Sequence, residues 1–196
     1  MRRALLALTA LVAGCASPPV APPMAIDWAA RSAAVTGWNE WSARGRLALK
    51  SAAGSGQADF DWQQAGEATS IRVSGPFGAG AYEIGWDREA LSIRSRDGEF
   101  SERYAGADAA EQFLATRLGW AFPATSTRWW LLGLPDPDFT ATTVFGADGR
   151  LAALTQNGWT VTYERYDDVA GVTMPGKVTA ENERARLRLV VDRWAY

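Results

Sequence analysis

The sequence predicts a mostly β fold of the α+β class, an antiparallel barrel or sandwich with short helices against its inner face. Many short segments alternate between apolar and polar residues, which is typical of strands with one buried side. Asn157-Gly158 joins two of these segments, and this pair is a strong signal for a two-residue hairpin. Two or three other segments break this alternation and are expected to be helices, one of them apolar on most sides.

The alternation is clearest in the first predicted strand. Trp41, Ala43, Leu47 and Leu49 share one side of it, and basic residues occupy the other side. The same period of two recurs along the chain, separated by turn-forming residues. Strands are expected at 41–50, 57–64, 69–74, 81–86, 90–94, 150–156, 159–166 and 185–194.

Three segments are expected to be helices. Residues 108–119 begin with Asp108 and Glu111 in the spacing of a capping box. Residues 126–135 are apolar on most sides, and such a helix must be buried. A weaker helical pattern covers 27–35. The helices are therefore expected to lie against the inner face of a curved sheet.

The start of the chain has the pattern of a lipoprotein signal peptide, residues 1–14. Arg2 and Arg3 precede an apolar run about half as long as the roughly 20 residues that a membrane-spanning helix needs. The run ends in Val12-Ala13-Gly14-Cys15, which matches a bacterial lipobox. We therefore expect Cys15, the only cysteine, to be the lipidated N-terminus of the mature protein, and several acyl chains give a stable anchor.

Residues 15–26 are expected to form a tether, and residues 27–196 a single domain. The tether holds four prolines and is therefore semi-extended. Without Arg2 and Arg3 the net charge changes from −2 to −4, and no basic stripe indicates nucleic-acid binding. Ala16 after the lipidated cysteine is compatible with sorting to the outer membrane.

Enzyme chemistry has little support in the sequence, and we predict a protein that is not an enzyme. The chain has no histidine, which excludes a Ser-His-Asp triad and every histidine-bearing metal site. No phosphate-binding glycine motif occurs, so no cofactor is expected. A hydrolase with two carboxylates stays open on residue types alone. The candidate pairs are Asp59 with Asp61, Asp87 with Glu89, and Asp167 with Asp168.

The 10 tryptophans have two interpretations. They are core residues, because aromatic side chains bury a large area wherever they occur. Alternatively, several of them line a cavity, because a curved antiparallel sheet can enclose an apolar ligand. Periodicity does not separate the two, since both require the same inward face.

Several motifs together resemble the LolB family, the outer-membrane lipoprotein receptors of the lipoprotein localisation (Lol) pathway. The resemblance covers nearly the whole mature chain in family order. Its pieces are the lipobox at Cys15, the first strand from Trp41 to Ala48, FDWQQ (60–64), GPFG (75–78), WWLLGLP (129–135), LTQNGWTVTYERYD (154–167), Met174-Pro175 and the last strand ending at Trp194.

The resemblance implies an open antiparallel β-barrel, a half-barrel, with short helices covering a hydrophobic cavity. It also implies a task, which is to accept lipoproteins from the periplasmic carrier LolA and to insert their acyl chains into the outer membrane. The protein would be anchored through Cys15 on the periplasmic face, and we expect a monomer without metal or cofactor. The expected lining of the acyl-chain cavity is Trp41, Leu47, Phe60, Trp62, Trp129, Leu132, Leu187 and Leu189.

The hairpin tip at 76–78 is unusual because it carries a phenylalanine between Pro76 and Gly78. In the family, an exposed apolar residue at this tip, usually leucine, acts in delivery to the membrane, and Phe77 occupies that position. The alternative is that Phe77 folds back as part of the core. A different function also stays open: a lipid-binding or structural outer-membrane lipoprotein with the same barrel, whereas Cys15 argues against a soluble carrier.

Overall fold

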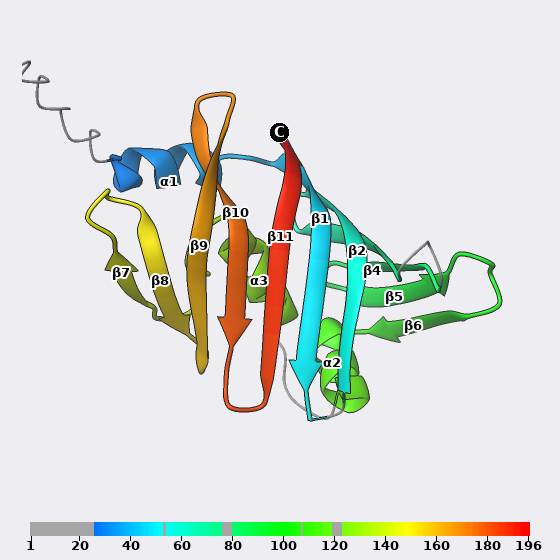
Figure 1. Cartoon of the computed structure of the whole chain (residues 1–196). Coiled ribbons are helices and arrows are strands. Elements are labelled where there is room, and N and C mark those ends of the chain that lie inside the picture. The colour runs from blue at the N-terminus through cyan, green and yellow to red at the C-terminus, as the bar shows by residue number, and fades with distance from the viewer. Residues whose placement is uncertain (1–25, 53, 76–79, 107, 119–122) are drawn as a thin grey trace, which may run out of the picture.

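The computed structural model describes residues 26–52, 54–75, 80–106, 108–118 and 123–196. Within these ranges the strands form one antiparallel sheet of 11 strands, in the order β6-β5-β4-β3-β2-β1-β11-β10-β9-β8-β7. The sheet is strongly curved but does not close, because β6 and β7 are separate edges (Figure 1). The predicted fold class, a mostly β open half-barrel with short helices, is confirmed.

The chain order explains this topology. Strands that follow each other in the chain pair with each other, apart from β6 and β7, which are the two edges. The one pairing between distant strands is β1 with β11, and it joins the two halves of the described sheet. The strands are β1 (Glu40–Ser51), β2 (Gly54–Ala65), β3 (Ala68–Ser74), β4 (Tyr82–Trp86), β5 (Ala90–Ser95), β6 (Ser101–Ala105), β7 (Thr142–Phe145), β8 (Leu151–Gln156), β9 (Trp159–Val169), β10 (Val172–Glu181) and β11 (Ala185–Ala195). The helices are α1 (Trp28–Thr36), α2 (Ala109–Leu118) and α3 (Ala124–Leu131).

All eight predicted strand segments are strands in the structure, and sequence analysis missed β6, β7 and β10. The reason is clearest for β10, which carries Pro175 and Gly176. The register shifts there, because proline has no N–H for the ladder. Arg165 of β9 covers the irregularity and donates to the carbonyl oxygens of Gly176 at 3.0 Å and Val191 at 2.9 Å.

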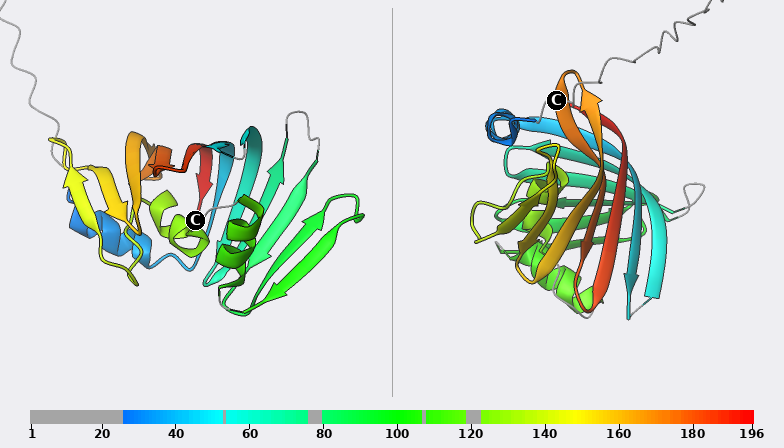
Figure 2. Two further views of the ribbon diagram at one scale, coloured as in Figure 1. Left: turned by 90° about the horizontal axis from the view of Figure 1, so that it is seen from below. Right: turned by 60° about the vertical axis from the view of Figure 1, so that its left-hand side comes forward.

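The helices α2 and α3 lie inside the curve of the sheet, as the two views of Figure 2 show. Trp130 and Leu131 of α3 are almost fully buried. Glu111 of α2 accepts hydrogen bonds from the backbone N and the hydroxyl of Thr125, so its carboxylate links α2 to the start of α3. No helix in the described part of the chain is both long and apolar enough to span a bilayer.

Helix α1 lies at one end of the sheet and is fixed there by a buried arginine (Figure 1). Arg31 donates from Nε to the Thr173 carbonyl at 2.9 Å and from Nη2 to the Leu132 carbonyl at 2.6 Å. Its guanidinium carbon lies 4.6 Å from the ring centroid of Trp28. Burial lowers the pKa of Arg31 to about 10. These contacts join α1, β10 and the end of α3.

The apolar interior consists of two clusters. The larger one is built on β1, β2, β8–β11 and α3, and it includes Trp41, Trp62 and Trp130. The smaller one packs β5 against α2 and the start of α3, with Leu91 and Ile93 at its centre. An apolar cavity lies where these two clusters meet.

Candidate functional site

An apolar cavity of about 250 Å³ lies where the two clusters meet. The inner face of the sheet forms most of its wall, and α2 and α3 close it from inside the curve. The lining residues are Leu47, Leu49, Phe60, Trp62, Ile71, Val73, Ile84, Trp86, Leu91, Ala110, Phe113, Ala124, Thr127, Leu187 and Leu189.

The period of two along each strand explains how the wall is made. Residues i and i+2 of a strand face the same side of a sheet, so each of β1, β2, β3, β4 and β11 contributes a pair of apolar side chains. Register brings these pairs together, since Leu47 lies opposite Leu189 and Leu49 lies opposite Leu187. Phe60 and Trp62 are buried, whereas Leu47, Leu49 and Leu187 are half-buried and reachable from solvent.

Among the described residues that line the cavity none is charged, and the side-chain polar atoms of Trp62 and Thr127 are already bonded. The Trp62 indole Nε1 donates to Gln64 Oε1 at 3.1 Å, and Thr69 donates to the same oxygen at 2.9 Å. The Thr127 hydroxyl donates to the Pro123 carbonyl at 2.9 Å. The described lining therefore offers an apolar ligand mainly carbon atoms to contact.

The structure places five of the eight predicted lining residues in this cavity: Leu47, Phe60, Trp62, Leu187 and Leu189. The other three lie elsewhere. Trp41 is buried between Trp62 and Trp194, with ring centroids 5.9 and 5.6 Å away. Leu132 is buried at the end of α3, where its carbonyl accepts from Arg31.

Trp129 lies on a different side of α3 from the cavity. Its ring is half-buried beside the Arg128 guanidinium, 5.0 Å from that carbon, in a separate hollow. The neighbouring Trp130 points into the larger cluster and donates to Gln156 at 2.9 Å. In a helix that is apolar on most sides, sequence alone does not say which tryptophan faces which wall.

Sequence reasoning also missed much of the lining that the structure reveals. Ile71, Val73 and Ile84 lie on the apolar side of strands that were predicted, so alternation alone could have placed them on the inner face. Phe113 of α2 is a different case, because its place in the wall depends on how the sheet curves around the helix. The predicted lipidation site Cys15 and the predicted delivery loop, Pro76, Phe77 and Gly78, lie outside the described residues.

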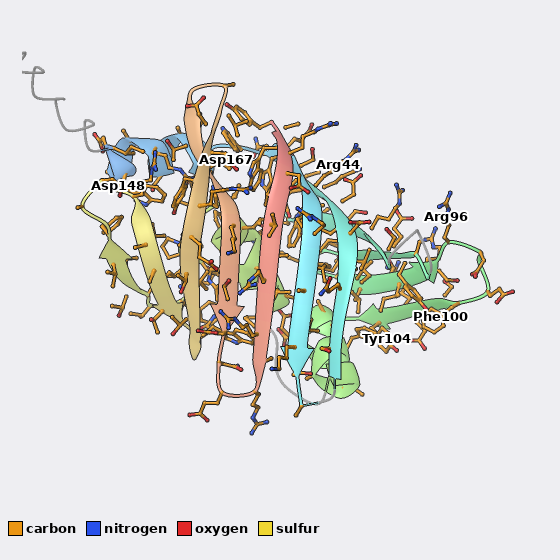
Figure 3. All side chains as sticks on the ribbon, in the orientation of Figure 1. Arg44, Arg96, Phe100, Tyr104, Asp148 and Asp167 are labelled. Atoms are coloured by element: carbon orange, nitrogen blue, oxygen red, sulfur yellow. The ribbon has the colours of Figure 1, made fainter. Side chains whose placement is uncertain are left out.

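The three carboxylate pairs that left a hydrolase open lie outside the cavity. Asp61 is on the outer face of β2 in an ion pair with Arg44 at 2.9 Å, and Asp167 pairs with Arg165 at 3.1 Å (Figure 3). Asp87 accepts from the backbone N of Glu89 and of Ala90, and these bonds lower its pKa. Asp61, Asp87 and Asp167 thus have structural partners of their own, and none of the six carboxylates is in the described lining of the cavity.

The family model and the curated relatives that match this chain belong to one family. The family model described as outer membrane lipoprotein LolB matches residues 39–194. The outer-membrane lipoprotein LolB of Nitrosococcus oceani is 33% identical over 190 residues, which cover 94% of this chain and 92% of that protein. The same-named protein of Chromohalobacter salexigens is 31% identical over 192 residues, covering 96% and 87%.

Among solved structures, the LolA superfamily protein NE2245 from Nitrosomonas europaea superposes with a TM-score of 0.51 at 11% identity, covering 81% of this chain and 86% of that one. At this identity the likeness shows the fold alone, an open sheet around inner helices. The family match extends over almost all of the described residues, including every strand that lines the cavity. The chain belongs to the LolB family of outer-membrane lipoproteins.

Proposed function

We propose that this chain is an outer-membrane-anchored receptor that accepts lipoproteins from the periplasmic carrier LolA, holds their acyl chains in the cavity and inserts them into the outer membrane. Family and fold support a role in lipoprotein localisation. The observation that carries the finer proposal is the uncharged, carbon-lined cavity between the sheet and α2 and α3.

The energetics explain why such a cavity is needed. Burying one methylene is worth about 0.8 kcal/mol, so an acyl chain of about 16 carbons costs on the order of 10 kcal/mol to expose to water. A lipoprotein therefore needs an apolar container on its way through an aqueous compartment. Leu47, Leu49 and Leu187 are half-buried on one side of the cavity and would offer the acyl chain its entrance. Transfer from the carrier requires only that this cavity binds the acyl chains more tightly than the carrier does, without catalysis.

The anchor and the delivery loop complete the proposal. Lipidated Cys15 would hold the receptor on the periplasmic face of the outer membrane, with residues 16–26 as the tether. Phe77, between Pro76 and Gly78, would enter the boundary of the bilayer during delivery. The strands that flank this loop, β3 and β4, contribute Val73 and Ile84 to the cavity, which supports a short path from cavity to membrane.

A transfer assay tests this proposal. Purified LolA loaded with a triacylated lipoprotein is mixed with the lipidated receptor, and liposomes are added afterwards. We expect cargo to move to the receptor and then into the liposomes. Phe77→Glu should leave uptake and melting temperature unchanged but prevent insertion, whereas the matched control Phe77→Leu should insert normally.

The alternatives give different results. If Phe77 is a core residue, Phe77→Glu lowers the melting temperature strongly and abolishes uptake as well. If the chain is a structural lipoprotein with the same barrel, no cargo moves from LolA to the unsubstituted receptor. Either result would contradict the part of the proposal that it addresses.

A further inference from the structure

Three arginine side chains gather on the outer face of the sheet, at one end of β3–β5. Arg72 of β3 and Arg94 of β5 lie on either side of Glu83 of β4 in the strand register. Arg96 follows the end of β5. All four side chains are exposed, and they border a surface hollow together with Ala81, Tyr82, Ser95 and Gly98. We call Arg72, Arg94 and Arg96 the arginine patch.

The arginine patch gathers three cations without an ion pair on one small area of the described surface. In the part of the chain that the structure describes, no ion pair joins any of the three guanidinium groups to a carboxylate. The carboxylate of Asp61, opposite Arg72 in register, is already bound to Arg44 at 2.9 Å. Glu83 is the one acidic residue in the described lining of this hollow, whereas Asp97, in the turn after Arg96, accepts hydrogen bonds from the Ser95 hydroxyl and from the backbone N of Glu99.

The positive charge of the patch is opposite in sign to the net charge of the described residues. The described residues contain 18 of the chain's 20 lysines and arginines, since Arg2 and Arg3 precede them, and all 22 aspartates and glutamates. Their net charge is therefore −4, and the protein as a whole is not attracted to an anionic surface. An anionic partner would therefore be attracted to a local basic area such as the arginine patch rather than to the molecule as a whole.

The opposite face of the same strand ends is apolar and aromatic. Tyr82 lies opposite Val73 in register, and Val73 lines the cavity. The Tyr82 side chain is 43% exposed, and its ring packs against Phe100 with centroids 6.4 Å apart. Figure 3 shows Arg96 and Phe100 at this end of the sheet, far from Asp148 beside β7. One edge thus has an aromatic side continuous with the cavity and a cationic side.

We propose that the arginine patch binds the phosphate groups of anionic phospholipids in the membrane that receives the cargo, and so holds the Tyr82 rim of the cavity against the bilayer. This inference rests on the proposed function, because it assigns the face from which acyl chains leave. Arginine forms bidentate, charge-assisted hydrogen bonds with phosphate. Tyrosine is enriched at the level of lipid headgroups. A phospholipid surface satisfies both sides of this edge, whereas an acidic protein would satisfy only the arginines.

The test uses the lipidated protein in vesicles of phosphatidylcholine alone or with phosphatidylglycerol. A fluorophore on Ser101→Cys, an exposed position on β6, reports contact through quenching by headgroup-labelled lipid. The test variant is Arg72→Gln/Arg94→Gln/Arg96→Gln. The control Lys50→Gln/Arg184→Gln/Arg193→Gln removes the same charge from exposed cations elsewhere that form no ion pair in the described residues.

We expect phosphatidylglycerol to increase quenching for the unsubstituted protein and the control, and not for the test variant. A basic residue near an anionic surface contributes about fivefold in partitioning, so the triple change should weaken contact roughly 100-fold. Each single change should weaken it about fivefold, which keeps the test valid if the triple variant does not fold.

The inference would be overturned by equal quenching of the test variant and the control, or by full displacement with excess inorganic phosphate at constant ionic strength, which would make the ligand a soluble anion. LolA binding is measured on the same variants. If the triple change abolishes LolA binding while vesicle contact persists, the patch binds an acidic protein partner and the inference is overturned. Uptake of cargo is measured separately, on the receptor in detergent before it is placed in vesicles. If the triple variant takes up cargo normally and its vesicle contact equals that of the unsubstituted protein, this inference is rejected and the proposed function stands. If the unsubstituted protein fails to take up cargo, both are rejected.

Discussion

Placing a carboxylate in the cavity should weaken acyl-chain binding in a way that depends on pH. Leu187 is the suitable position, because it lines the cavity and is only half-buried, so Leu187→Asp can remain hydrated while no ligand is bound. The lost burial should then cost about 1 kcal/mol of folding stability. The matched control is Val190→Asp, which lies on the other face of the same strand.

The magnitude follows from the cost of removing the charge. An acyl chain that fills the cavity excludes water from position 187, so the aspartate must be protonated or buried as an anion. Protonation at pH 7 of a carboxyl whose ordinary pKa is about 3.9 costs about 4 kcal/mol, or roughly 1000-fold in Kd. Because part of the side chain remains near solvent, we expect a loss of about 100-fold at pH 7.

The sign of the pH effect is fixed by the same reasoning. Binding favours the protonated form, so the affinity of Leu187→Asp should recover by up to about tenfold for each unit of pH decrease between 7 and 5. The assay is displacement of an uncharged fluorescent acyl probe, with circular dichroism as the check on folding. A folded Leu187→Asp protein that binds like the Val190→Asp control, or whose affinity does not change with pH, would refute this assignment of the cavity.

Three further predictions concern the anchor, the sheet and acid stability. Cys15→Ala should release the protein from the outer-membrane fraction, and fractionation checks this. Gly45→Ala should destabilise the fold by about 3 kcal/mol or more, because its Cβ would meet the backbone of β11, whereas Gly56→Ala, with open space, should leave the melting temperature unchanged. Hydrogen bonds from Lys177 and Thr179 lower the pKa of Glu164. The ionised carboxylate therefore stabilises the fold above the ordinary carboxyl pKa, and this stabilisation is lost as the pH falls through the lowered pKa. Glu164→Gln should make the melting temperature less dependent on pH on the acid side, which a melting-temperature profile against pH checks.

The strands of the sheet were largely predictable because their signal is local. Alternation alone places Leu187 and Leu189 on the inner face, and Asn157-Gly158 does form the β8–β9 hairpin, with both residues at positive φ. The β10 strand was missed because Pro175-Gly176 reads as a break, whereas Arg165 bridges that break with hydrogen bonds. Arg165 and Gly176 are 11 residues apart in the chain, and the alternation of apolar and polar residues does not reveal such a contact.

The cavity was only partly predictable, for a reason of geometry. Trp41 and Leu47 share a side of β1, yet only Leu47 reaches the cavity, since Trp194 and Trp62 pack around Trp41. In the same way Trp129 and Thr127 belong to one helix, and its rotation against the sheet decides that Thr127 faces the cavity. Which inward side chains are core and which are lining depends on where helices fill the curve of the sheet, and that depends on contacts far apart in sequence.

Site-specific photocrosslinking from inside the cavity tests the central claim most directly. A photoreactive amino acid replaces Leu187 in one sample and Val190, on the opposite face of β11, in the other. LolA loaded with a lipoprotein carrying radiolabelled acyl chains is added, and the samples are irradiated. The account predicts a labelled adduct to the acyl chains from position 187 and none from position 190. Equal adducts from both positions, or cargo transfer with no adduct at 187, would contradict it.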